Sequence, residues 1–217
     1  MKAMILAAGL GSRMRPLTDH TPKPLLEVGG KPLIVWHIER LKEAGFTEIV
    51  INVAYLGQQI IDFLGDGSLY GVSIEFSDEQ DEGALETAGG IVKALPLLSE
   101  TFLVVNGDIW TDYSFEHTFQ LSNNHLAHLI LVNNPKHNLE GDFYLSNRLD
   151  KYTFSGIGYY SKKMFTELTF GKQALAPLLF KAIAEGHITT SLHQGQWYDI
   201  GTPERLEKLN NILLNSV

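Results

Sequence analysis

The stretch KAMILAAGLGSR, residues 2–13, decides the fold, because an apolar run passes directly into a loop with two glycines. Its first part, Ala3–Ala7, has the length and composition of a buried β-strand. The apolar run ends at Leu10, so it is too short to span a bilayer, and no small-residue cleavage site of a signal peptide follows it. We therefore expect an interior strand and a cytoplasmic protein.

Short apolar runs of this kind recur along the chain and alternate with segments of helical periodicity. This alternation is typical of an α/β fold. We expect a single Rossmann-like domain over residues 1–217, with a mixed, mostly parallel sheet and helices on both faces. The predicted strands are Ala3–Ala7, Glu48–Val53, Ser73–Phe76, Thr101–Val105, Leu126–Val132, Ser155–Tyr160 and His187–Leu192. The predicted helices are Pro32–Ala44, Gln58–Leu64, Thr87–Leu95, Phe115–Ser122, Leu175–Glu185 and Pro203–Leu214.

Composition excludes several classes of protein. The 17 Lys and Arg residues against 25 Asp and Glu residues give a net charge of −8, which argues against sequence-independent binding of nucleic acid or of anionic membranes. The chain contains no Cys, which excludes disulfide scaffolds, thiolate zinc sites and cysteine nucleophiles. Its eight His residues lack the H-x-x-x-H and H-E-x-x-H spacings of zinc sites, and the G-x-S-x-G elbow of serine hydrolases does not occur.

The loop after the first strand concentrates positive charge in this acidic chain. Gly9 and Gly11 let the backbone approach a ligand, and Arg13, Arg15 and Lys23 follow on the same loop. The loop is not a dinucleotide fingerprint, because Met stands at position 14 in place of the third glycine, and no G-K-[ST] of a P-loop follows. Guanidinium and ammonium groups suit polyphosphate oxygens, which favours a phosphate site over a tight turn with solvated arginines.

Two aspartates lie where an open α/β sheet binds ligands, beyond the carboxyl ends of its strands. Asp108 follows the strand Thr101–Val105, and Asp199 precedes Gly201 and a helix that begins with Pro. Carboxylates at such an edge suit Mg²⁺, which takes one or two of them together with substrate phosphates. The alternative interpretation is that Asp108 is a turn residue and Asp199 a helix cap.

Three motifs together resemble those of the sugar-1-phosphate nucleotidyltransferases: LAAGLGSR with PLT and PKP over residues 6–24, Gly-Asp at 107–108, and WYDIGT at 197–202. The resemblance implies that Arg13 and Lys23 are catalytic and that Asp108 and Asp199 hold Mg²⁺. It also implies that the base is recognised at the LETAG turn and by a side chain just before it, which is Glu79, Gln80 or Asp81. The implied nucleotide-binding residues are Ala8, Gly9, Gly11, Ser12, Arg13, Thr87, Ala88 and Gly89.

A closer resemblance is to the uridylyltransferases of this family that act on N-acetylmuramate 1-phosphate in cell-wall recycling. It rests on LETAGG at 85–90, NGDIWTD at 106–112, EGDF at 140–143 and YTFSGI at 152–157. It implies transfer of UMP from UTP to the sugar 1-phosphate, with release of pyrophosphate, by a monomer or small homo-oligomer that lacks the β-helix extension of many relatives. The implied sugar-binding residues are Asn106, Gly141, Asp142 and Ser155, with Arg148 or Lys151 as the partner of the lactyl carboxylate.

Two alternatives stay open. Guanylyl or thymidylyl transfer to mannose 1-phosphate or glucose 1-phosphate keeps the reaction and changes the substrates. A non-catalytic nucleotide-binding subunit would keep the fold, but loss of Arg13, Lys23 or an aspartate would be its signature, and all of these are present.

Overall fold

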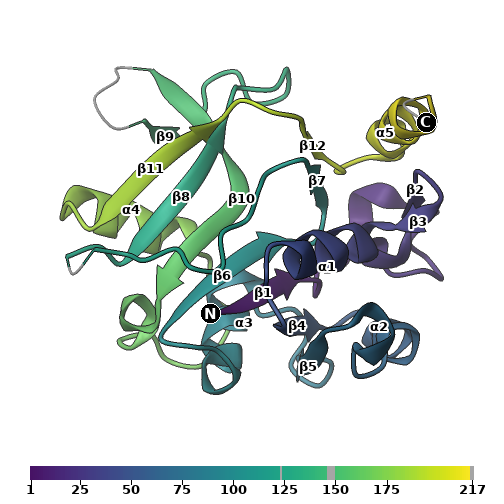
Figure 1. Cartoon of the computed structure of the whole chain (residues 1–217), viewed down its shortest axis with the longest axis horizontal. Coiled ribbons are helices and arrows are strands. Elements are labelled where there is room, and N and C mark those ends of the chain that lie inside the picture. The colour runs from purple at the N-terminus through teal and green to yellow at the C-terminus, as the bar shows by residue number, and fades with distance from the viewer. Residues whose placement is uncertain (123, 146–149, 216–217) are drawn as a thin grey trace.

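The described residues of the chain form one eight-stranded mixed sheet with helices around it (Figure 1). The structure is a computed structural model that describes residues 1–122, 124–145 and 150–215. Along the sheet the strands are β11 (Ile188–His193), β8 (Ala127–Val132), β10 (Lys151–Ser161), β6 (Thr101–Asn106), β1 (Lys2–Leu6), β4 (Glu48–Val53) and β5 (Ser73–Asp78), and β9 (Phe143–Tyr144) pairs with β10. The predicted α/β class with a mixed, mostly parallel sheet is confirmed.

Strand β1 lies inside the sheet and runs parallel to both neighbours, β4 and β6. Its side chains alternate between two cores: Ala3 and Ile5 face one, and Met4 faces the other, each with no exposed surface. A strand that is covered on both faces has to be apolar at every position. This explains the unbroken apolar run at the start of the chain.

Helices cover both faces of the sheet, as predicted. The core around Ala3 and Ile5 takes apolar residues from α1 (Leu33–Glu43) and α2 (Gly57–Leu64). The core around Met4 takes them from α3 (Glu86–Ala94) and α4 (Ala176–Ala184). A third, smaller cluster joins α5 (Pro203–Leu214) to the hairpin of β2 (Glu27–Val28) and β3 (Lys31–Pro32), which lies beside it in Figure 1. The 3₁₀ turns are η1 (Ser12–Met14), η2 (Lys23–Leu25), η3 (Ser68–Tyr70), η4 (Leu95–Leu97) and η5 (Lys162–Phe165). None of the helices in the described ranges is long and apolar enough to cross a membrane.

Strand β10 is the exception to the parallel arrangement, since it runs antiparallel to both β6 and β8. It spans eleven residues, more than the predicted Ser155–Tyr160, because a bulge between Phe154 and Ile157 lets the strand continue past an irregular step. The bulge contains Gly156, whose φ of 81° is a left-handed conformation that favours glycine.

A second, two-stranded sheet of β7 (Ile109–Thr111) and β12 (Trp197–Asp199) was not predicted from the sequence. Each of its strands has only three residues, too few for a periodic signal. In this antiparallel pair Asp199 is the register partner of Ile109, the residue after Asp108. The small sheet therefore brings the two predicted acidic sites to one place.

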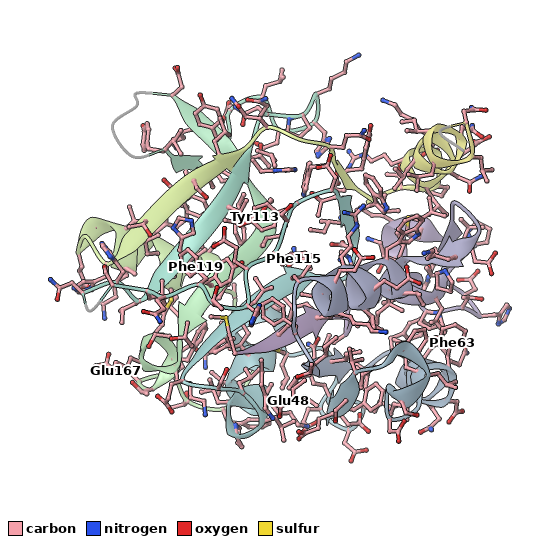
Figure 2. The ribbon with its side chains drawn as sticks, in the orientation of Figure 1. Glu48, Phe63, Tyr113, Phe115, Phe119 and Glu167 are labelled. Atoms are coloured by element: carbon pink, nitrogen blue, oxygen red, sulfur yellow. The ribbon has the colours of Figure 1, made fainter. Side chains whose placement is uncertain are left out.

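The predicted helix Phe115–Ser122 is wrong, because this segment runs as an irregular covering over the sheet. Phe115 and Phe119, labelled in Figure 2, are both on this segment. Phe115 is buried in the core, and the ring of Phe119 stacks on Tyr159 with centroids 4.2 Å apart. The amide of Glu116 donates to the Tyr159 hydroxyl over 2.9 Å. Two aromatic residues four positions apart lie on the same side of a helix, so their spacing is compatible with one. In this segment the same two residues pack against the sheet although the backbone is not helical.

Candidate active site

A cavity of about 560 Å³ opens at the carboxyl ends of β1 and β6, between the glycine-rich loop and the start of α3. This is the edge at which α/β sheets bind ligands. The residues that line it are Leu6, Ala7, Ala8, Gly9, Leu10, Gly11, Ser12, Arg13, Met14, Lys23, Pro24, Asn52, Glu79, Ala84, Glu86, Thr87, Asn106, Gly107, Asp108, Lys172 and Gly201. Lys23, Asn106 and Asp108 are therefore brought together with six of the predicted nucleotide residues, which are Ala8, Gly9, Gly11, Ser12, Arg13 and Thr87.

Contacts with neighbouring residues of the protein hold the glycine-rich loop in its conformation. Gly11 has a φ of 63°, and a Cβ atom there would lie 2.9 Å from a methyl group of Thr18. The Thr18 hydroxyl donates to the Gly11 carbonyl over 2.8 Å, and the Met14 amide donates to the same oxygen. Met14 is 1% exposed and belongs to the third apolar cluster, which explains why this position is not the glycine of a dinucleotide fingerprint.

Lys23 and Asp108 form an ion pair at the wall of the cavity. Lys23 Nζ donates to Asp108 Oδ2 over 2.8 Å, across 85 positions of sequence. Lys23 is only 8% exposed, whereas the Asp108 side chain is 44% exposed. The ammonium is thus held inside the protein wall and the carboxylate faces the opening.

Asp199 lies next to this pair. The Ile200 amide donates to the carbonyl of Asp108 over 2.8 Å, which ties the two acidic loops together. Both oxygens of the Asp199 carboxylate have partners: Arg205 Nη1 donates to Oδ2, and His137 Nε2 lies 3.1 Å from Oδ1. Sequence reasoning missed Arg205 and His137, because neither belongs to a motif and His137 is far from Asp199 in sequence.

The donor chemistry of this place fits magnesium. Asp108 and Asp199 offer the hard carboxylate oxygens that Mg²⁺ prefers, and the adjoining cavity leaves room for phosphate ligands. Among the described residues, no group of three or more His, Asp or Glu side chains is arranged to hold a metal ion. A magnesium ion would therefore depend on oxygens of the substrate as well as on these two carboxylates.

A buried hydrogen-bond network supports the far wall of the cavity. The Ala7 amide donates to Asn52 Oδ1 over 2.8 Å, and Asn52 Nδ2 donates to Glu79 Oε1 over 2.7 Å. Glu79 Oε2 accepts from the Leu85 amide over 2.9 Å, and Glu79 has no exposed surface. Of the three candidate base-reading side chains, Glu79 lines the cavity, whereas Gln80 and Asp81 are exposed outside its lining.

The amides at the start of α3 have a protein partner that the sequence did not indicate. Ala88 and Gly89 donate to the carbonyl of Gln173 over 3.0 and 3.1 Å, and the Gln173 amide donates to Leu85 over 2.9 Å. A Cβ atom on Gly89 would lie 2.2 Å from the Gly171 carbonyl, so this contact requires glycine. The role of Ala88 and Gly89 in binding the base stays a prediction, and in this structure both amides are engaged by the segment 171–173.

Of the four predicted sugar-binding residues, only Asn106 lines the cavity. The Asp142 carboxylate accepts from Asn138 Nδ2 and from the Phe154 amide, over 3.1 and 2.8 Å. Ser155 is 1% exposed, and its hydroxyl donates to the Ile130 carbonyl over 2.7 Å inside the β10 bulge.

Gly141 packs against the backbone of Lys151, where an added Cβ atom would lie 2.8 Å from the carbonyl. Gly141 and Asp142 thus brace a loop against β10, and Ser155 supports the bulge. Lys151 Nζ lies 5.4 Å from the centroid of the Tyr144 ring, and Arg148 lies outside the described residues.

Comparison with known proteins places this site in a family. Over 96% of both chains, the protein is 55% identical to an N-acetylmuramate alpha-1-phosphate uridylyltransferase of Neisseria meningitidis serogroup B. It is 40% identical to a UTP–glucose-1-phosphate uridylyltransferase of Synechocystis over 52% of this chain and 31% of that protein. A solved structure from Bacillus anthracis, assigned as a glucose-1-phosphate thymidylyltransferase, has the same fold, with a TM-score of 0.86 at 24% identity over 99% of this chain and 96% of its own.

The resemblance drawn from the sequence motifs is confirmed by these matches. The family model described as nucleotidyl transferase matches residues 2–143, which include the glycine-rich loop, Lys23, the start of α3 and Asp108. With this match and a relative of more than half identity along nearly the full length, the chain belongs to the nucleotidyl transferase family.

Proposed function

We propose that this protein transfers a uridylyl group from UTP to N-acetylmuramate 1-phosphate, yielding the UDP-sugar and pyrophosphate. The observation that carries the proposal is the Lys23–Asp108 ion pair on the wall of a cavity that the glycine-rich loop also lines. The uridylyltransferase of N. meningitidis, 55% identical over 96% of the chain, supports the choice of substrates.

In the proposed reaction an oxygen of the sugar 1-phosphate attacks the α-phosphorus of UTP in line. A new P–O bond forms, the bond from the α-phosphorus to the bridging oxygen breaks, and its electron pair leaves with pyrophosphate. A phosphate monoester has a second pKa near 6, so the nucleophile is largely dianionic at neutral pH and needs no general base. The protein therefore contributes positioning and charge stabilisation rather than proton transfer.

The cationic side chains are suited to separate parts of this reaction. Lys23 is fixed by burial and by its bond to Asp108, so its ammonium is preorganised to stabilise charge on the α-phosphoryl group. Arg13 is exposed on the glycine-rich loop, where its guanidinium fork can follow the leaving pyrophosphate. The backbone of Ala8 to Ser12 approaches the triphosphate closely, because Gly9 and Gly11 carry no side chains.

Asp108 and Asp199 would hold magnesium in the working enzyme. The metal would supply neutralising positive charge between the triphosphate and the sugar phosphate. The two carboxylates are connected through the Ile200–Asp108 backbone bond, so their relative position is set by the protein and not by the ligand.

A matrix of substrates tests this proposal. Pyrophosphate release is measured for UTP, GTP and dTTP, each with N-acetylmuramate 1-phosphate, N-acetylglucosamine 1-phosphate, glucose 1-phosphate and mannose 1-phosphate. We expect the highest kcat/KM for UTP with N-acetylmuramate 1-phosphate. A maximum with GTP and mannose 1-phosphate, or with dTTP and glucose 1-phosphate, would replace the proposed substrates. Nucleotide binding without pyrophosphate release from any pair would make the chain a non-catalytic subunit.

A further inference from the structure

Arg205 occupies an unusual position for a cation. It lies in the first turn of α5, where the positive end of the helix dipole disfavours positive charge. Its guanidinium leaves the helix and binds Asp199 Oδ2, with 29% of the Arg205 side chain and 25% of the Asp199 side chain exposed. The ion pair is therefore partly removed from solvent, and it lies beside the proposed phosphate site.

Gly201 locates the Arg205 guanidinium relative to the rest of the site. A Cβ atom added to Gly201 would lie 2.9 Å from Arg205 Nη1, 3.1 Å from Asp199 Oδ2 and 3.3 Å from Arg13 Nη1. Because all three atoms lie within 3.3 Å of one point, the guanidinium groups of Arg205 and Arg13 are close to each other beside Gly201, which lines the cavity. Two guanidinium groups thus converge at its edge, a typical arrangement for binding phosphate oxygens.

Both predicted metal ligands are paired with a cation in the free protein: Asp108 with Lys23 and Asp199 with Arg205. At Asp199, where both carboxylate oxygens already have partners, a free divalent cation would have to compete with Arg205, and it would lie close to positively charged groups. A metal ion already bound to a triphosphate brings negative charge with it. Arg205 can then exchange the carboxylate for a phosphate oxygen without losing an ionic partner.

We propose that Arg205 competes with free divalent metal for Asp199 and, when a metal–nucleotide complex binds, transfers to the phosphates beside Arg13. This inference rests on the proposed function and adds to it an order of events, in which the metal enters with UTP. It also assigns Arg205 as a positioning residue for Asp199 that becomes a phosphate contact. His137, 3.1 Å from Asp199 Oδ1, remains as the second support of the carboxylate.

The test measures metal binding directly, with Mn²⁺ as the probe and electron paramagnetic resonance as the readout. For the wild type we expect weak binding of free Mn²⁺ and tight binding of Mn²⁺ together with a non-hydrolysable UTP analogue. Arg205→Gln removes the competing charge, so we expect free Mn²⁺ to bind at least tenfold more tightly. The same variant loses a phosphate contact, so we expect its KM for UTP to rise at least tenfold. Lys208→Gln, which removes a positive charge from an exposed position of the same helix, is the matched control and should leave both values unchanged.

These opposite changes separate the proposal from a structural role, which would weaken both kinds of binding together. The proposal is wrong if Arg205→Gln leaves the affinity for free Mn²⁺ unchanged or weaker. Arg205→Lys provides a second measurement should the Gln variant not fold: it keeps the charge, so free Mn²⁺ should bind as weakly as to the wild type, and tighter binding would also overturn the proposal. A wild-type protein that binds no Mn²⁺ even with the UTP analogue would instead refute the proposed function itself.

Discussion

The amide of Ile200 donates to the carbonyl of Asp108 over 2.8 Å, so the two loops that carry the acidic side chains are joined through backbone atoms. Antiparallel pairing of β7 with β12 continues this contact along the two strands. Such a connection does not depend on either carboxylate. Substitution of an aspartate should therefore change the chemistry of the site and leave its geometry in place.

For Asp108→Asn we expect kcat to fall by about a hundredfold or more, as is usual when one electrostatic stabiliser is removed. Asparagine has nearly the same shape and can still accept a hydrogen bond from Lys23, so the fold should remain intact. Pyrophosphate release measures kcat, and circular dichroism measures thermal unfolding. Glu207→Gln, an exposed change on α5, is the control. Full activity of Asp108→Asn would remove this residue from the site.

Lys23→Ala should also lower kcat by at least about a hundredfold, because the ammonium is preorganised by burial and by its pairing with Asp108. Lys31→Ala is a matched control, since Lys31 also forms a carboxylate pair, with Glu39, but lies away from the cavity lining. Steady-state kinetics and thermal unfolding are measured for both variants. An effect of Lys23→Ala confined to thermal stability would show that Lys23 serves only the turn between its two prolines.

The parts of the fold that the sequence predicted are those with long, regular apolar patterns. Strands such as β1 and β4 are buried on both faces, so they need the apolar runs from which they were predicted. The segment around Phe119 misled the prediction, because its aromatic spacing fits a helix although the rings pack against β10 and β8. Strands of three residues, such as β7 and β12, are too short to show an alternation of apolar and polar residues. They form because each pairs with a segment that is distant in the sequence.

The residues of the candidate site also fall into a group that was predicted from the sequence and a group that was missed. The glycine-rich loop, Lys23 and the two aspartates were predicted because their residue types form recognisable motifs. Arg205 was missed because it belongs to none of the motifs although it follows Asp199 closely, and His137 was missed because only the folded chain brings it to Asp199. Ser155 and Asp142 belong to a motif and their side chains bond within the protein, so the motif has a structural reason here, and their role in sugar binding stays a prediction.

The contact between α3 and the segment 171–173 leads to a prediction about stability. Gly89→Ala would place a methyl carbon 2.2 Å from the Gly171 carbonyl, and backbone on both sides has to move. We expect the free energy of unfolding to fall by about 1–3 kcal/mol. Gly9→Ala is the control, because a Cβ atom there meets nothing within 4 Å, and its free energy of unfolding should stay within about 0.5 kcal/mol of the wild type. Urea unfolding measures both, and equal stability of the two variants would contradict the contact.

The protonation of His37 makes the free energy of unfolding depend on pH. Burial lowers the pKa of His37 from 6.5 to about 4, and the imidazole bonds to the backbone of Ile109, next to Asp108. The folded protein therefore keeps this histidine neutral at a pH where the unfolded chain binds a proton. The resulting stability is complete above pH 6.5 and is lost as the pH falls towards 4. At about pH 5 the loss amounts to about 2 kcal/mol, because each tenfold difference in proton affinity between the two states corresponds to about 1.4 kcal/mol.

His37→Gln cannot titrate, so the fall in its free energy of unfolding between about pH 7 and about pH 5 should be about 2 kcal/mol smaller than that of the wild type. The comparison uses the pH dependence of each protein and not its absolute stability, so a general destabilisation by the substitution does not affect the result. Urea unfolding at both pH values gives the measurement, with His20→Gln, at an exposed position, as the control for loss of an imidazole. If His37→Gln keeps the pH dependence of the wild type, His37 takes up its proton over the same pH range in the folded and the unfolded protein, and burial does not lower its pKa.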